Sequence, residues 1–189
     1  MRAALLAAGL LALACPEARA ENWLFYAGSA KTANKEQTLI DWYQANSLKP
    51  VPEDKAAIRN YYDEESVAAN SPFGGGTVRV WGKSVVQGEV ESYDEAMRVL
   101  EREEAKRLKR KLTTIDTARL FPQAVNRAVK EITIQYEMNC EEKEFYIYEA
   151  NSYDSTGAKM TRQLNMDMAN WVPIQARSVM EELFKKVCQ

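Results

Sequence analysis

Histidine is absent from the 189 residues of this sequence, and its absence restricts the chemistry open to the chain. Without an imidazole there is no base for the Ser-His and Cys-His arrangements, and a zinc site would need carboxylates to complete it. A glycosidase needs only two placed carboxylates. The acids that could serve lie in turns and charged runs, which is typical of solvated surface: Glu64, Glu65, Glu141, Glu142 and Glu144. We therefore expect a protein that is not an enzyme and that uses no metal and no cofactor.

Long apolar runs are equally scarce, and the longest lies in the first twenty residues, MRAALLAAGLLALACPEARA. Arg2 precedes an apolar stretch at 3–14, and an A-x-A sequence follows at 18–20. This order is that of a secretory signal peptide. The stretch is shorter than the roughly 18 residues that indicate a membrane span. We expect a signal peptide at 1–20, cleavage after Ala20, and no transmembrane segment elsewhere.

A second interpretation of the same segment is a lipid anchor. The sequence before Cys15 is similar to a bacterial lipobox, in which the cysteine is acylated, although Ala12 stands where leucine is usual. Cleavage after Ala20 is the preferred interpretation, with lipidation of Cys15 as its alternative. Both routes predict export to the periplasm, the outer membrane or the cell surface of a Gram-negative bacterium.

Cysteine is rare: the chain has three, and Cys15 is either removed or lipidated. The remaining pair, Cys140 and Cys188, predicts one disulfide in an oxidising compartment. A metal pair or a redox pair is the alternative, but the spacing matches neither. The formal net charge of −2 argues against nucleic acid or an anionic membrane as the partner. We expect one domain over 21–189, which is long enough for a hydrophobic core.

Strand and helix patterns alternate along this domain. Aromatic residues at 22–28 and alternation at 77–86 predict strands, and a helical period predicts an inserted helix at about 34–47. Ser92 and Glu95 form a capping box that opens a charged helix over 92–112. The basic residues near its end are balanced by acids one turn earlier, as on a solvated helix.

The second half of the chain predicts a hairpin and a terminal helix. In EITIQYEMNC, apolar residues alternate with polar ones, so Cys140 shares a face with Ile132 and Ile134. FYIYEANSY predicts the return strand, and YDSTG a turn. Ser178 caps an apolar helix that ends near Cys188. The predicted fold is α+β: an antiparallel sheet packed by helices, with the C-terminal helix tied to a strand by the disulfide.

These landmarks, in this order, resemble the surface-adhesin protein E family of secreted and lipid-anchored bacterial proteins. The similar pieces are YYDEESV, VRVW, YEMNC, YDSTG and a terminal W-x-P-I pattern that continues from Trp171 to Cys188. The resemblance covers roughly 58–90 and 115–189; the insert at 30–57, which holds the helix expected at 34–47, and the long charged helix at 92–112 depart from the minimal pattern. It implies a disulfide-linked α+β fold and, for the named member, attachment to extracellular-matrix proteins.

Aromatic and basic residues on one strand suggest where a partner would bind. Arg79, Trp81 and Lys83 alternate with apolar residues and so share the mixed face of the strand. Trp23 and Trp171 are expected to pack in the core. We expect a non-enzymatic exported protein that binds a protein or matrix-like macromolecule through this stripe. The alternative is a periplasmic structural or assembly module with no adhesive role; oligomeric state is left open.

Overall fold

The computed structural model describes residues 22–30, 46, 48–68, 76–164 and 171–189. The signal peptide expected at 1–20, with Cys15, lies outside these residues, and so does nearly all of the helix expected at 34–47.

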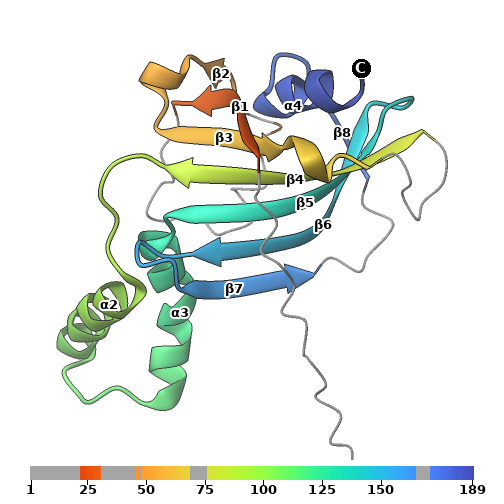
Figure 1. Ribbon diagram of the computed structural model, residues 1–189. Coiled ribbons are helices and arrows are strands. Elements are labelled where there is room, and N and C mark those ends of the chain that lie inside the picture. Colours follow the sequence, from red (N-terminus) through yellow and green to blue (C-terminus); the bar gives the residue numbers. More distant parts are fainter. Residues whose placement is uncertain (1–21, 31–45, 47, 69–75, 165–170) are drawn as a thin grey trace, which may run out of the picture.

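One antiparallel sheet organises the described part of the chain (Figure 1). Its strands run in the order β2-β1-β3-β4-β5-β6-β7. The short strand β8 pairs with the first two residues of β6, whereas β7 pairs with the second half of β6. The bounds are β1 Trp23–Ser29, β2 Pro50–Val51, β3 Ile58–Asp63, β4 Thr77–Val86, β5 Glu131–Asn139, β6 Glu144–Tyr153, β7 Lys159–Leu164 and β8 Val172–Pro173. Two short 3₁₀ helices, η2 Glu53–Lys55 and η3 Glu64–Ser66, flank β3. The expected antiparallel α+β fold is confirmed.

The period-two pattern of β5 explains how the sheet acquires a core face. Ile132, Ile134, Tyr136 and Met138 are all buried, as the alternation predicts. Gly82 on the neighbouring strand β4 pairs with Ile134 and makes room for the Tyr136 ring. The core face of the sheet is therefore closely packed at its centre.

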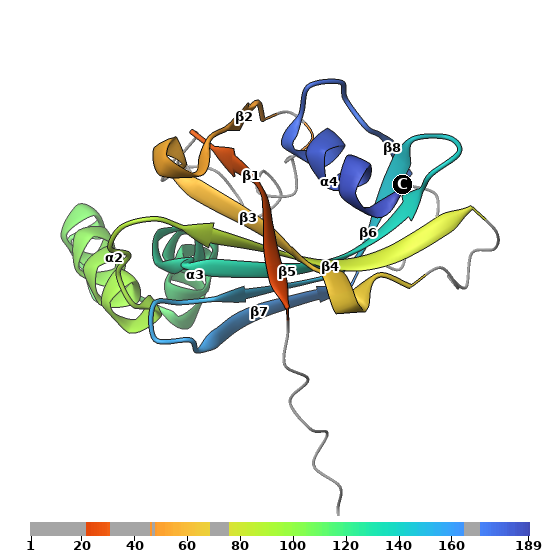
Figure 2. The same cartoon turned by 45° about the horizontal axis from the view of Figure 1, so that its top comes forward.

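The terminal helix α4 (Val179–Val187) covers this core face (Figure 2). Ser178 caps it by accepting a hydrogen bond from the Glu181 backbone N–H at 3.0 Å. Its apolar stripe joins the core cluster with residues of β1, β3, β4, β5 and β6. The predicted Cys140–Cys188 disulfide is present, with 5.4 Å between the Cα atoms. It fastens the end of α4 to the end of β5.

Helices α2 (Tyr93–Leu108) and α3 (Thr114–Ala128) form a hairpin at the other end of the sheet (Figure 1). They share a small core of Ala96, Leu100, Leu120, Ala124 and Ala128. The helix predicted over 92–112 begins as expected but ends earlier, because Lys109 takes a left-handed conformation with φ 52°. No helix was predicted from the sequence over the residues of α3.

Candidate binding face of the sheet

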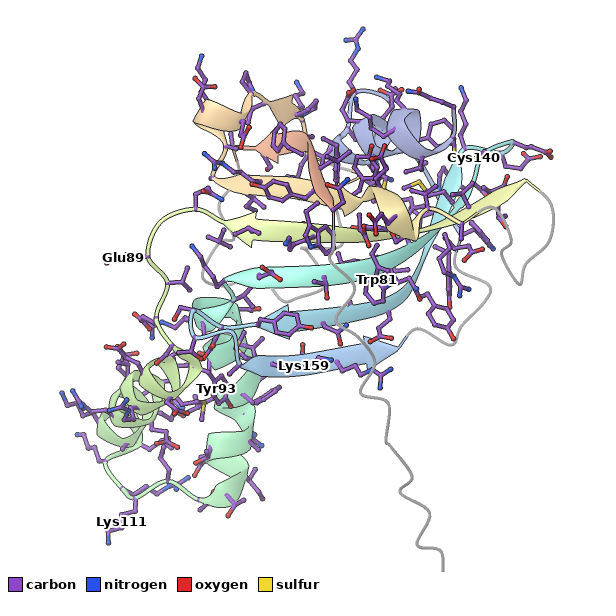
Figure 3. All side chains as sticks on the ribbon, viewed as in Figure 1. Trp81, Glu89, Tyr93, Lys111, Cys140 and Lys159 are labelled. Carbon is purple, nitrogen blue, oxygen red and sulfur yellow. A yellow bond between two sulfur atoms is a disulfide. The ribbon has the colours of Figure 1, made fainter. Side chains whose placement is uncertain are left out.

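The face of the sheet opposite α4 forms the candidate site, and we call it the open face. No α-helix of the described residues lies over its centre (Figure 1). Figure 3 shows the Trp81 side chain near the middle of this face and Lys159 at its β7 border. Strand register defines its members, because residues paired across an antiparallel ladder point to the same side. They include Trp23, Asp63, Arg79, Trp81, Lys83, Thr133, Glu137, Glu149, Asn151 and Tyr153.

Two of the three predicted binding residues lie beside each other on this face. Lys83 is paired with Thr133, which is paired in turn with Asn151, and Trp81 is paired with Gln135. Both Trp81 and Lys83 are partly exposed. The alternation that placed them on the mixed face of the strand therefore agrees with the register.

Arg79 lies on the same strand but is engaged by the protein itself. Its Nε donates a 2.9 Å hydrogen bond to Oε2 of Glu137, and its guanidinium lies 4.9 Å from the centroid of the Tyr148 ring. The Arg79 side chain is 26% exposed, whereas that of Glu137 is fully buried. The alternation in EITIQYEMNC puts Glu137 on the more polar face of β5. The structure places it on that face, but its side chain is buried. The Arg79 side chain is therefore held against its neighbours within the face and is less available to a partner than Trp81 or Lys83.

Lys83 and Trp23 form a contact that sequence reasoning missed. The Lys83 ammonium lies 4.2 Å from the centroid of the Trp23 ring, in a cation–π arrangement. Trp23 was expected in the core, but it is only half-buried and lies on the open face. The reason is register: Trp23 pairs with Asp63, whose side chain faces away from α4. Trp171 is also half-buried, and its ring centroid lies 6.0 Å from that of Tyr146.

A hollow of about 180 Å³ opens on this face. Its lining comes from five strands and comprises Trp23, Asp63, Trp81, Thr133, Asn151 and Tyr153. Only Trp81 among these residues was singled out as a binding residue from the sequence. The others could have been found by combining the period-two pattern with a correct strand order, which a single sequence does not supply.

Asn151 is the most buried polar residue of the hollow. It is 4% exposed, and its Nδ2 donates a 3.0 Å hydrogen bond to Oε1 of Glu149. Its Oδ1 atom is buried and has no hydrogen-bond partner. Arg162 donates two hydrogen bonds to Glu149 and, together with the Asn151 bond, holds the pKa of that carboxyl below its ordinary value. Glu149 is therefore a charged anchor that orients the Asn151 amide.

The part of the chain that the structure describes contains no group of three or more Cys, Asp or Glu placed to hold a metal ion. In those ranges no helix is long and apolar enough to cross a membrane.

Together these features define a class: a single-sheet α+β domain with a disulfide-clasped helix on one face and a partly aromatic hollow on the other. The chain belongs to the surface-adhesin protein E family, whose sequence model matches residues 48–189. The match contains five of the six residues that line the hollow and leaves out Trp23 on β1.

Two solved structures of protein E from Haemophilus influenzae are similar to this chain. One is 12% identical with a TM-score of 0.39, and covers 68% of this chain and 76% of that one. The other, crystal form II, is 10% identical with a TM-score of 0.40, and covers 68% of this chain and 79% of that one. No curated protein matches the sequence.

Proposed function

We propose that this protein is exported, is not an enzyme, and binds a macromolecular partner at the cell envelope through its open face. The observation that carries the proposal is the hollow on a sheet face that α4 leaves uncovered, with Trp81 in its wall and Lys83 beside it. Tryptophan is enriched among the anchor residues of protein interfaces, and a neighbouring charge steers association. Membership of a surface-adhesin family supports the same function.

Each residue of the predicted stripe has a separate role in this proposal. Trp81 and Lys83 contact the partner, because both are partly exposed and both face outward. Arg79 is a positioning residue, because its guanidinium is held by Glu137 and Tyr148. Binding is non-covalent and needs no cofactor.

Export is proposed on the sequence at 1–20 together with the disulfide. Disulfides form and persist in the periplasm and at cell surfaces, and are rare in the cytosol. The Cys140–Cys188 bond is therefore consistent with a mature domain outside the cytoplasm, whether the leader is cleaved after Ala20 or Cys15 is lipidated.

The binding proposal is tested by capture of partners from extracellular-matrix preparations with the purified chain. Trp81→Ala should reduce capture at least about tenfold, as expected for a tryptophan anchor, and Lys83→Ala should reduce it by a smaller factor. Lys111→Ala is the matched control, since Lys111 is an exposed lysine at the far end of the α2–α3 hairpin (Figure 3). Equal capture by all four proteins would overturn the assignment of the open face.

The location is tested by labelling lysines of intact cells with a reagent that does not cross membranes. A surface protein is labelled before the outer membrane is broken. Labelling that appears only after breakage would instead support the periplasmic structural or assembly module.

A further inference from the structure

The aromatic residues of the hollow come from three strands. Trp23 is on β1, Trp81 on β4 and Tyr153 on β6, and all three are half-buried. Half-buried rings offer apolar surface to a ligand while remaining accessible to it. They attract either a cation or the apolar face of a neutral molecule.

The charges around the hollow disfavour an ionic ligand. The ammonium groups of Lys83 and Lys159 already lie 4.2 Å and 5.9 Å from the centroids of the Trp23 and Tyr153 rings, so a further cation there would be repelled. Asp63 contributes a carboxylate to the wall, which repels an anion. Two of the rings already have a lysine beside them and the wall contains a carboxylate, which leaves a neutral ligand as the best match.

The residues that line the hollow include a hydrogen-bond acceptor without a donor. Asn151 Oδ1 is a buried acceptor without a partner, and leaving such an atom unpaired is unfavourable. Its Nδ2 is committed to Glu149, so the amide cannot turn without losing that bond. Asp63 and Thr133 line the same space with further polar groups. A ligand hydroxyl would satisfy Oδ1.

We propose that the hollow binds one ring of a neutral saccharide. A pyranose ring is neutral, carries hydroxyl donors at its edge, and has an apolar C–H face that can lie on the Trp81 ring. The volume of about 180 Å³ is smaller than the roughly 300–1,000 Å³ of drug-sized pockets, which suits one ring of a longer chain. This inference rests on the proposed function, because it names the ligand class of the same face.

The test begins with the purified chain on a broad array of neutral glycans, including the tetrasaccharides of glucose and N-acetylglucosamine. The best binder is then titrated while the indole N–H signals of the four tryptophans are followed by NMR. The signals of Trp23 and Trp81 should shift, and that of Trp171 should not. Absence of binding to every neutral glycan, or a shift of Trp171 alone, would overturn the proposal.

Variants test the same site independently. Trp81→Ala and Asn151→Ala should each weaken glycan binding at least about tenfold, the first by removing a stacking surface and the second by removing the Oδ1 acceptor. Phe121→Ala is the control, because Phe121 is an exposed aromatic residue on α3, outside the hollow. Thermal melts identify any variant that fails to fold, and the NMR mapping on the parent chain does not depend on them.

A final comparison separates this inference from the proposed function. A captured matrix partner is stripped of its glycans by glycosidases and tested again. Loss of capture supports the saccharide. Capture that persists and still depends on Trp81 overturns the saccharide inference and leaves a protein ligand on the open face. Capture that never depended on Trp81 overturns both.

Discussion

The carboxylate of Glu137 is fully buried on the open face and is held at 2.9 Å by the Nε of Arg79 from the adjacent strand. The two residues are direct cross-strand partners. Their other polar atoms, Glu137 Oε1 and Arg79 Nη2, are buried without hydrogen-bond partners. A pair of this kind contributes little net stability, but the loss of one partner exposes the full cost of burying the other.

Arg79→Ala should therefore destabilise the protein by about 3 kcal/mol, because it leaves the Glu137 charge uncompensated. The double variant Arg79→Met with Glu137→Leu should lose less than the single variant. Arg162→Ala is the control: it breaks a surface pair with Glu149 in which Arg162 is 57% exposed, and should cost only about 0–1 kcal/mol. Urea denaturation measures all three, and equal losses for Arg79→Ala and Arg162→Ala would contradict the argument.

Removing the disulfide should lower stability without changing the fold. Cys140 and Cys188 are separated by 48 residues, and closing a loop of that size contributes about 4 kcal/mol by the chain-entropy account. The double variant Cys140→Ser with Cys188→Ser should lose a comparable amount in urea denaturation. A reducing agent should lower the melting temperature of the parent and leave that of the double variant unchanged. An unchanged parent would contradict the prediction.

Gly82→Ala should destabilise the centre of the sheet by about 1–3 kcal/mol through overpacking. A Cβ at Gly82 would lie 2.8 Å from Cε2 of Tyr136, whose ring is in the core. Combining it with Tyr136→Leu should cost less than the sum of the two single changes, since the smaller side chain makes room for the methyl group. A double-mutant cycle in urea measures this coupling, and strict additivity would show that the two residues do not meet.

The turn at Asp154 should make stability depend on pH in the acid range. Burial raises the pKa of Asp154, but hydrogen bonds donated by Thr156, Tyr93 and Ala158 outweigh burial and hold this pKa below its ordinary value of 3.8. A carboxyl with a lowered folded-state pKa stabilises the protein above its unfolded-state pKa and loses that effect as the pH falls. Asp154→Asn should thus be less stable than the parent at pH 7.

The difference between Asp154→Asn and the parent should narrow as the pH falls below about 4, the unfolded-state pKa of an aspartate. Urea titrations at intervals from pH 7 to pH 2.5 give the comparison. Glu142→Gln, an exposed carboxyl in the β5–β6 turn, is the control and should follow the parent at every pH. A gap that remains constant over the whole range would rule out this role for Asp154.

Much of the fold could be predicted because its signals are local. β4, β5 and β6 follow from alternation, and α4 from its cap and apolar stripe. The disulfide follows from having two cysteines left in a chain whose first twenty residues predict export. Its partners are confirmed at Cys140 and Cys188.

Among the elements that the sequence did not predict, α3 and β7 have signals that are weak in isolation. Helix α3 contains Pro122, and its capping box uses Thr113 with Asp116 in place of the serine and glutamate found elsewhere in the chain. Its helical period is visible only once Leu120, Ala124 and Ala128 are known to meet α2. β7 lies at the border of the sheet, where polar residues replace the apolar alternation of an inner strand.

The hollow was harder to predict than the fold. Alternation placed Arg79, Trp81 and Lys83 on one face, but only strand order reveals that Trp23 and Asn151 share it. Sequence alone also could not show that Arg79 on β4 donates a hydrogen bond to the buried carboxylate of Glu137 on β5.

Along β4, neighbouring residues have different roles: one packs in the core and the next lies on the outward face of the sheet. Val80 lies wholly in the interior, while Trp81 next to it and Lys83 two residues further on are partly exposed on the outward face. Mutations can therefore redesign the outward surface one position at a time and leave the interior intact. A scaffold of this construction can diversify what it recognises faster than it changes its shape.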